Sequence, residues 1–364
     1  MYPDLQHIAQ SIFGAPMPQW LGIVKTFGLF LAIAFIVASY VLAAELKRKE
    51  KQGLLSPERV FKDKNDVEGK LVYPHERVGS IVMLALIGGI AGAKIFNAFE
   101  TWQNFLKDPI GNLFSGGGLT FYGGLIVAGT ILIYYTCKHK IDIRHFADSV
   151  APALMLAYGI GRFGCHFSGD GDWGIFNSAY TTISDGLLKK GSVNDFHDAI
   201  SNASGYFTSN FGLLENVRHL YAPAPSGLPD WLFANNFKHN VIGEGIPLSG
   251  CTGSYCSVLP VAVFPTSFYE AIICILLFFL LWLVRKRFKY PLHLFWFYLI
   301  LNGIERFFVE KIRVNYKYDW GFIHPTQAEI ISTILVLIGI GILLFYKKEE
   351  YAVDTEIKTE ANVL

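Results

Sequence analysis

The stretch LMLAYGIGRFGCHFSGDGDWG, residues 154 to 174, starts as an apolar run, contains Arg162 and ends in glycines and aspartates. An arginine inside a run that crosses a membrane costs roughly 2.5 to 3.5 kcal/mol at the bilayer centre, so it is expected to face a protein interior or a wet cavity. Its guanidinium group stays charged and presents a planar fork of donors that suits phosphate oxygens. Arg162 is therefore either a structural arginine paired with a neighbouring carboxylate or part of a buried anion site near one membrane face.

The composition around this stretch is that of a membrane protein. Of the 364 residues, 52% are hydrophobic and only 17% are charged, which is typical of chains that cross a bilayer. A window of about 20 residues finds seven candidate spans, at residues 20–44, 78–98, 117–137, 146–167, 264–284, 291–312 and 325–346. We predict an all-α polytopic membrane protein with seven transmembrane helices.

Clusters of basic residues indicate the orientation of these spans. They follow the first, third, fifth and seventh spans, at residues 47–51, 138–144, 285–289 and 347–348. Because basic residues close to membrane ends mark the cytoplasmic side, we expect the N-terminus outside and the C-terminus in the cytoplasm. The predicted organisation is helices one to four within residues 1–167, a large outward-facing insert at 168–263, helices five to seven within 264–346 and a cytoplasmic tail at 347–364.

Two of the five cysteines, Cys251 and Cys256, lie in the predicted insert. An oxidising compartment favours a disulfide between them. A metal site is not expected, because this pair has no second pair of ligands nearby. The strands or helices of the insert are not predicted.

Glycines surround the polar residues of the second and third predicted spans. Lys94 follows IGGIAGA at residues 87–93, and Tyr122 lies within SGGGLTFYGGLIVAG at residues 115–129. Glycines weaken a helix and allow close helix approach, while broken backbone at membrane depth is tolerated where it lines a cavity. Two interpretations stay open, namely tight helix packing and a pocket wall that carries the Tyr122 hydroxyl group.

Charged residues also occur in the fifth and sixth predicted spans. Glu270 ends the motif FPTSFYE, and ERFFVEKIR at residues 305–313 places Arg306, Glu310 and Arg313 at positions i, i+4 and i+7. Residues at that spacing share one helix face. The three charges form either a structural ion-pair ladder or a site for an anion or a lipid headgroup.

Most of these polar residues are predicted to reach a similar depth in the membrane. Those in the outer halves of their spans are Lys94, Tyr122, Arg162, Glu270, Arg306, Glu310 and Gln327. Because the spans run in alternating directions, isolated packing residues would not be expected to converge in this way. We predict one outward-opening cavity with positive charge.

Five motifs in this order resemble the prolipoprotein diacylglyceryl transferases of bacterial inner membranes. They are GGLTFYGGLI at 117–126, GRFGC followed by GDGDWG at 161–174, FPTSFYE at 264–270, ERFFVEKIR at 305–313 and Gln327 of the seventh span. The resemblance implies transfer of a diacylglyceryl group from phosphatidylglycerol to the lipobox cysteine thiol of a prolipoprotein, with release of glycerol phosphate. It also implies no metal or other cofactor and no nucleic acid. The implied partners are phosphatidylglycerol, the lipobox peptide and the bilayer of the bacterial inner (cytoplasmic) membrane.

The resemblance implies roles for individual residues. Arg162 matches the arginine that binds the phospholipid phosphate, Arg306 matches a second essential arginine, and Glu310 matches the acidic residue one turn later. Arginines at a phosphodiester stabilise the departing phosphate and lower the pKa of the attacking thiol, whose thiolate is the effective nucleophile. We expect catalytic roles for Arg162, Arg306 and Tyr122, and substrate binding by Arg162, Lys94, Gly174, Glu310, Arg313, Glu270 and Gln327.

Several positions differ from the pattern of that family. Tyr122 stands where the family often has histidine, and because a neutral phenol is a poor base, His166 is an alternative proton acceptor. The acidic equivalent within GDGDWG is either Asp170 or Asp172, and Phe27 stands where the family has a tyrosine. A transporter or lipid-binding membrane protein that uses the same arginines is the alternative function, although transporters more often show internal repeats and discontinuous helices.

Overall fold

The chain forms two compact units that alternate along the sequence. The computed structural model describes residues 1–61, 69–114, 118–183, 186–315, 318–319, 321 and 324–346. The first unit consists of Met1–Ala34, Met155–Leu283 and Phe297–Ile342. The second unit consists of Phe35–Leu154 and Val284–Trp296, with residues 343–346 at the end of the described chain.

Five helices of the described chain are long and apolar enough to cross a membrane. They are α2 (Thr26–Lys51), α3 (Val78–Glu100) with the 3-10 turn η2 (Pro74–Arg77) before it, α6 (Phe121–Lys138), α10 (Thr266–Val284) and α12 (Gln327–Phe345). Helices of this length that are apolar on all sides match the hydrocarbon core of a bilayer. The chain is a mostly helical, polytopic membrane protein, as its composition predicted.

Two further long helices, α7 (Ile143–Ser168) and α11 (His293–Glu310), lie at the fourth and sixth predicted spans. Neither belongs to the five helices that are apolar enough to cross a membrane; α7 contains Arg162, and α11 contains Glu305, Arg306 and Glu310. The total of seven spans and their orientation stays a prediction. The predicted cytoplasmic tail, residues 347–364, lies outside the described residues.

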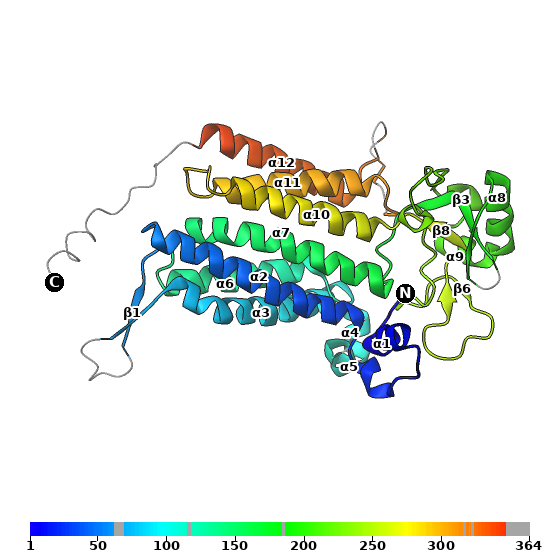
Figure 1. Ribbon diagram of the computed structural model, residues 1–364, viewed down its shortest axis with the longest axis horizontal. Coiled ribbons are helices and arrows are strands. Elements are labelled where there is room, and N and C mark those ends of the chain that lie inside the picture. Colours follow the sequence, from blue (N-terminus) through cyan, green and yellow to red (C-terminus); the bar gives the residue numbers. More distant parts are fainter. Residues whose placement is uncertain are drawn as a thin grey trace. The chain divides into compact units, whose positions relative to one another are not determined.

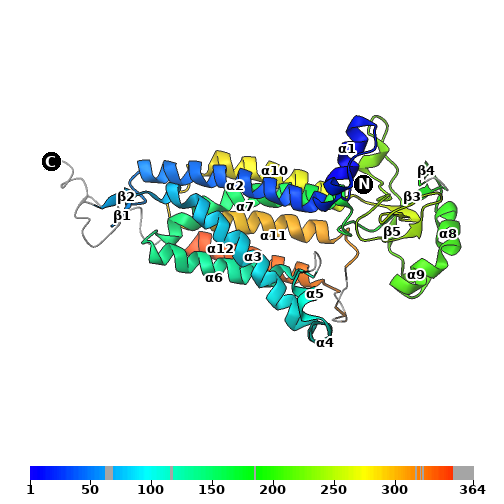
Figure 2. The ribbon, with the colours of Figure 1, turned by 90° about the horizontal axis from the view of Figure 1, so that it is seen from below.

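In the second unit, α3 and α6 pack against each other through glycines (Figure 2). A side-chain carbon on Gly92 would lie 2.4 Å from the carbonyl oxygen of Gly123, and one on Gly123 would lie 2.6 Å from the carbonyl oxygen of Gly92. Only residues without a Cβ allow backbones to approach so closely. These glycines therefore serve tight helix packing, the first of the two interpretations above.

The other elements outside the insert are short. They are α1 (Leu5–Phe13), the 3-10 helix η1 (Gln19–Ile23), the antiparallel pair β1 (Glu58–Val60) and β2 (Lys70–Val72), α4 (Trp102–Lys107) and α5 (Pro109–Phe114). Helix α1 begins where Oδ1 of Asp4 accepts a hydrogen bond from the His7 N–H. It ends at Gly14, whose φ of 65° suits a helix end.

The predicted insert contains a sheet as well as helices (Figure 1, green to yellow). Strand β3 (Phe176–Thr182) pairs antiparallel with β4 (Leu188–Lys190) and β8 (Val261–Val263), and parallel with β5 (His219–Leu220). The other elements are α8 (Val193–Asn202), α9 (Ser204–Phe211), the 3-10 turns η3 (Leu214–Asn216) and η4 (Asp230–Leu232), and the pair β6 (Ile246–Pro247) and β7 (Ser257–Val258).

The prediction of an all-α chain is therefore wrong for this segment. The strands are short, and Phe176 of β3 lies opposite both His219 and Val263, which are distant in the sequence. Pairing of this kind leaves no local period in a hydropathy window, which detects helices and long strands.

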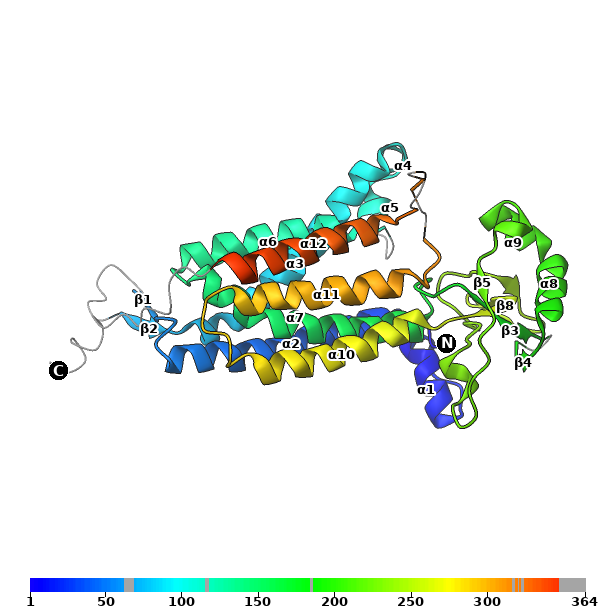
Figure 3. The same cartoon turned by 90° about the horizontal axis from the view of Figure 1, so that it is seen from above.

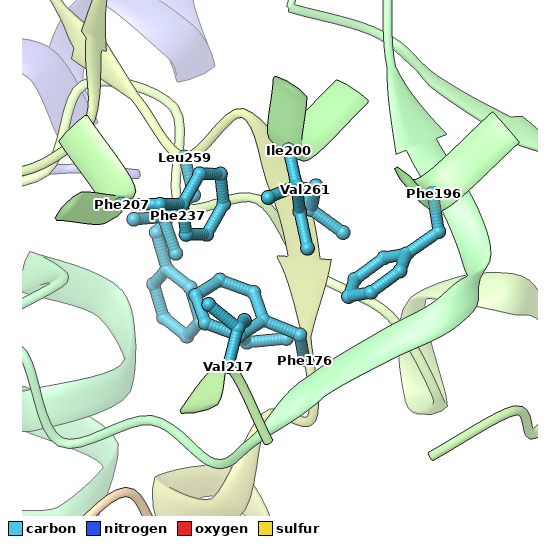
Figure 4. Close-up of a cluster of buried hydrophobic side chains, with 9 residues drawn as sticks. Phe176, Phe196, Ile200, Phe207, Val217, Phe237, Leu259 and Val261 are labelled. Carbon is cyan, nitrogen blue, oxygen red and sulfur yellow. The ribbon is translucent and has the colours of Figure 1, made fainter. Parts of the chain in front are cut away.

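A cluster of aromatic and aliphatic side chains fills the core of the insert (Figure 4). Its buried members are Phe176, Phe196, Ile200, Phe207, Val217, Phe237, Leu259, Val261 and Val263. Phe196 and Ile200 are four residues apart on α8, so both face the sheet. The insert therefore has a hydrophobic core of its own.

The disulfide expected between Cys251 and Cys256 is present. It closes the loop of the β6–β7 hairpin. Within that loop, the Tyr255 hydroxyl group accepts a hydrogen bond of 2.7 Å from Nζ of Lys25, which precedes α2. The bridged loop is thus tied to the segment that leads into the first apolar helix.

Candidate functional site

Arg162 lies in the last two turns of α7, where only 16% of its side chain is exposed. Its guanidinium carbon lies 5.0 Å from the ring centre of Tyr158, one turn earlier in the helix. Its Nε lies 2.6 Å from Oε2 of Glu270, and its Nη1 bonds Oδ2 of Asp172. The arginine singled out in the apolar run is thus paired with two carboxylates, as a buried charge requires.

Glu270, near the start of α10, is the centre of the site. Its side chain is 0% exposed, and besides Arg162 it pairs with Arg306 at 2.9 Å and with Arg313 at 3.3 Å. Helix α7 runs between α10 and α11 in Figure 3, and Glu270 of α10 pairs with Arg162 of α7 and with Arg306 of α11. Three guanidinium groups therefore share one fully buried carboxylate.

The charges at the end of α11 form a ladder that continues beyond the helix. Nη2 of Arg306 lies 2.9 Å from Oε2 of the buried Glu310, which also accepts a hydrogen bond of 2.5 Å from Asn315. Arg313 lies after the last helical residue, so the prediction that it shares the helical face is wrong. Its backbone instead forms an isolated β-bridge with Gly174, and its guanidinium group pairs with Glu270 and Asp172.

Asp172 lies in the loop after α7, where Gly171 takes a φ of 96° that favours glycine. Its carboxylate bonds Arg162 through one oxygen and Arg313 through the other. Burial would raise the pKa of Asp172, but these two arginines lower that pKa to about 2. At Asp170, in contrast, burial and the charge of Asp172 raise the pKa of the carboxyl group. Of the two candidate acidic positions, Asp172 is the one that meets the arginines.

Gly174 joins the loop after α7 to two other segments. Its N–H donates a hydrogen bond of 2.9 Å to the carbonyl oxygen of Phe264. A Cβ at this position would lie 2.7 Å from the carbonyl oxygen of Ile312 and 2.8 Å from the methyl carbon of Thr266. Glycine is required here for close backbone packing, and its role in substrate binding stays a prediction.

We call the six ion-paired residues the arginine cluster: Arg162, Arg306, Arg313, Asp172, Glu270 and Glu310. Its three positive charges are matched by three negative ones, so the cluster has no net charge. The predicted positive charge of the wider cavity, which includes Lys94, stays a prediction. Each buried arginine pairs with at least one carboxylate, because an unpaired charge in the protein interior is costly.

One group of side chains has the spacing of metal ligands. The ligand atoms of Cys165, Asp170 and Asp172 lie within 4.8 Å of one another. A cation there would compete for Asp172 with two guanidinium groups that already bind it. We assign no metal to this group.

Comparison with known proteins identifies the family of the chain. Residues 20–345 match the profile of the prolipoprotein diacylglyceryl transferase family. The chain belongs to this family. The transferase is 25% identical to the phosphatidylglycerol–prolipoprotein diacylglyceryl transferase of Leptospira interrogans, with 89% of each chain aligned. The corresponding proteins of Chlorobaculum tepidum (27% identity, 74% of this chain and 73% of the relative) and Enterococcus faecalis (25%, 96% and 93%) are similar to it as well.

Two predicted site residues of the transferase, Lys94 and Tyr122, belong to the second unit. Lys94 of α3 is buried, and its Nζ donates a hydrogen bond of 3.1 Å to the carbonyl oxygen of Asn112. Tyr122 is the second residue of α6, and 41% of it is exposed. Their convergence with the arginine cluster stays a prediction.

Gln327 and His166 belong to the first unit but have other surroundings than the cluster. Gln327 is exposed in the first turn of α12 and makes no side-chain hydrogen bond to a described residue. His166 is buried against the rings of Phe167, Phe237 and Phe268. An aromatic environment of this kind is typical of a packed side chain and does not favour His166 as the proton acceptor.

Sequence reasoning missed three residues around the cluster. Tyr158 lies under Arg162 and Asn315 bonds Glu310. Glu305 is buried on α11, and neither of its carboxylate oxygens has a hydrogen-bond partner among the described residues. The i to i+4 spacing of Tyr158 and Arg162 was a readable signal, whereas the place of Asn315 depends on how the chain leaves α11.

Proposed function

We propose that the arginine cluster binds the phosphate group of phosphatidylglycerol while this transferase moves the diacylglyceryl group to the lipobox cysteine of a prolipoprotein. The chain carries out the reaction for which its family and relatives are named, transfer of diacylglyceryl from phosphatidylglycerol to prolipoprotein. In that reaction the thiol sulfur bonds the terminal glyceryl carbon. The bond between that carbon and the phosphate oxygen breaks, the thiol proton is lost, and glycerol phosphate leaves.

The observation that carries the proposal is the pair of arginines around one oxyanion. Arg162 of α7 and Arg313 after α11 bond the two oxygens of a single carboxylate, that of Asp172. Guanidinium groups placed in this way are equally suited to two oxygens of a phosphate. Phosphate gains a second negative charge as it leaves, and fixed cations stabilise that charge most where water is scarce.

The buried carboxylates position these arginines. Glu270 pairs with all three guanidinium groups, and Glu310 pairs with Arg306 one turn away. Both carboxylates are 0% exposed, so water does not compete with the guanidinium groups for them. We assign them a positioning role, because a guanidinium group with a fixed orientation loses less freedom when it binds.

The proposed membrane arrangement has seven spans, including α7 and α11, in the bacterial inner membrane. The N-terminus and the insert at 168–263 then face outward, and the tail at 347–364 is cytoplasmic. The basic clusters support this orientation. The bridge between Cys251 and Cys256 supports it too, because disulfides persist on the oxidising side of that membrane.

The remaining predicted site residues receive roles in the same reaction. We assign substrate binding to Lys94, Gly174 and Gln327, and a hydrogen bond to the reacting groups to Tyr122. Lys94 supplies a cation for the lipid headgroup. Tyr122 is 41% exposed near the start of α6, and donation of a hydrogen bond suits its neutral phenol better than acceptance of a proton.

Transfer with labelled lipid tests this function. Purified protein receives phosphatidylglycerol labelled in the diacylglyceryl portion, together with a lipobox peptide. Wild type is expected to label the peptide thiol, and Arg162→Ala to lower the rate about 100- to 1,000-fold, as removal of one fixed donor to a developing anion does. Arg162→Lys keeps the charge without the fork and is expected to recover only part of that loss. Tyr122→Phe measures the contribution of the hydroxyl group. Folded wild type that binds the lipid but leaves the peptide unlabelled would instead favour lipid binding or transport.

A further inference from the structure

The two arginines that face a phosphate in the proposed function already bind a carboxylate of the chain. Nη1 of Arg162 bonds Oδ2 of Asp172, and Nη2 of Arg313 bonds Oδ1 of the same side chain. Each oxygen of Asp172 therefore takes the place that a phosphate oxygen would need. A phosphate and Asp172 cannot both use these donors.

Asp172 differs from the other two carboxylates of the arginine cluster in its exposure. Its side chain is 30% exposed, whereas those of Glu270 and Glu310 are 0% exposed. An anion that enters from solvent or from the lipid headgroup region meets Asp172 before the buried carboxylates. Asp172 is thus the carboxylate of the cluster that an incoming anion can displace most easily.

The charges of the cluster point to the same residue. With Asp172 in place, three arginines face three carboxylates, and the cluster does not attract an anion. With Asp172 turned away, the remaining five groups carry one positive charge, which equals the charge of one phosphodiester in size. Displacement of Asp172 therefore exchanges one anion for another and leaves no uncompensated charge in a poorly solvated site.

The displacement needs only a rotation of the Asp172 side chain, while its backbone stays in place. The Asp172 N–H donates to Oδ1 of Asp170 at 3.3 Å, and its carbonyl oxygen accepts a hydrogen bond of 3.2 Å from Oγ1 of Thr266. After Asp172, Gly174 is anchored to Phe264 through its N–H. The side chain can therefore leave the arginines while the bridge between Gly174 and Arg313 stays formed.

We propose that Asp172 is a built-in substitute for the phospholipid phosphate: it occupies Arg162 and Arg313 in the resting enzyme and is displaced when phosphatidylglycerol binds. This inference rests on the proposed function of the cluster. After transfer, Asp172 competes with glycerol phosphate for the same donors at the high effective concentration of an attached group. Its return therefore promotes release of the product.

Binding of glycerol phosphate, measured by titration calorimetry on purified protein in neutral detergent, tests the inference without any need for transfer. Asp172→Asn is expected to bind this anion about tenfold or more tightly than wild type. If Asp172 leaves the arginines free in roughly a tenth of the wild-type molecules, the apparent affinity for the anion is tenfold weaker than that of the free site. Asparagine carries no charge and does not compete for the arginines. Asp170→Asn is the matched control, because Asp170 lies in the same loop and bonds the Asp172 N–H rather than an arginine. It is expected to bind as wild type does.

The transfer assay gives a second readout. Asp172→Asn is expected to lower KM for phosphatidylglycerol and to increase inhibition by added glycerol phosphate, whereas Asp172→Glu, which restores the carboxylate, reverses both changes. Equal or weaker binding of glycerol phosphate by folded Asp172→Asn, while wild type still transfers label, overturns the displacement and leaves the proposed function intact.

If Asp172→Asn does not fold alone, thermal melts with and without glycerol phosphate decide the matter. The added anion is expected to raise the melting temperature of Asp172→Asn more than that of wild type, because it supplies the missing partner of both arginines. An equal or smaller rise in the variant overturns the inference.

Discussion

Replacement of Glu270 by glutamine is expected to lower the free energy of unfolding more than any other single isosteric change in the arginine cluster. The substitution keeps the size and shape of the side chain and removes only its charge. Glu270 is 0% exposed and pairs with Arg162, Arg306 and Arg313 at 2.6, 2.9 and 3.3 Å. All three arginines would lose their common partner at once.

The size of the effect follows from that geometry. Removal of one partner from a buried ion pair costs about 3–5 kcal/mol, because the other charge is left uncompensated in a poorly solvated site. Asp172 and Glu310 still neutralise part of the charge, so the cost does not triple. We expect a loss of about 3–5 kcal/mol, or roughly two to four orders of magnitude in the unfolding equilibrium.

The chain provides a matched control at Glu305. This residue is buried on the adjacent helix to a similar extent, with 4% exposed, and its carboxylate oxygens have no hydrogen-bond partner among the described residues. The same change, Glu305→Gln, exchanges a buried carboxyl group for an amide of similar size without breaking an ion pair that the structure describes. It is expected to leave stability within about 1 kcal/mol of wild type or to raise it.

Unfolding of both variants is measured with a denaturing detergent titrated into mild detergent and followed by tryptophan fluorescence. The decisive quantity is the difference in stability between Glu270→Gln and Glu305→Gln, since it cancels the effect of exchanging a buried carboxyl group for an amide. Equal stability of the two variants would refute the central place of Glu270 in the arginine cluster.

Three further outcomes are expected. Gly174→Val should lower transfer activity at least about tenfold, because the added side chain clashes with the backbone. Gly161→Ala should leave activity and melting temperature unchanged, because a Cβ at Gly161 meets no atom within 4 Å. An equal loss of activity in both variants would count against the packing role of Gly174. Reduction of the bridge between Cys251 and Cys256 should cost about 2 kcal/mol, as expected for a short closed loop, and melts with and without reductant measure it. Because the folded-state pKa of Asp172 lies near 2, below its unfolded value, its stabilising effect is complete above the unfolded pKa and lost on acidification. The stability difference between wild type and Asp172→Asn should therefore be constant from about pH 8 to 5 and shrink between about pH 5 and 2; a difference that shrinks between pH 8 and 6 would contradict this pKa.

Some features of the fold could be predicted because they depend on local properties of the chain. Apolar runs of about 20 residues indicate membrane helices wherever they occur, and five of them coincide with long apolar helices of the described chain. The spacing of Arg306 and Glu310 predicts a shared face, and these side chains pair at 2.9 Å. A helical period needs no knowledge of the rest of the molecule.

The site was predicted less completely, because its contacts join distant segments. Arg313 was expected on the face of α11, but the helix ends at Glu310 and the bridge to Gly174 sets its position. The choice between Asp170 and Asp172 could not be made from spacing, since both lie in one glycine-rich loop. Contact with an arginine 141 residues away made that choice.

The sequence by itself determined that this protein is a helical membrane protein with arginines in its apolar runs, and its ordered motifs indicated the family. Hydropathy, helical period and motif order are all properties of short segments, so they can be read without a fold. Only the tertiary structure decided that the arginines are neutralised by carboxylates, that Glu270 is shared by three of them, and that the insert is built on a sheet. Each of these depends on pairing between segments that folding brings together, and the free energy of a buried charge depends on all the charges around it.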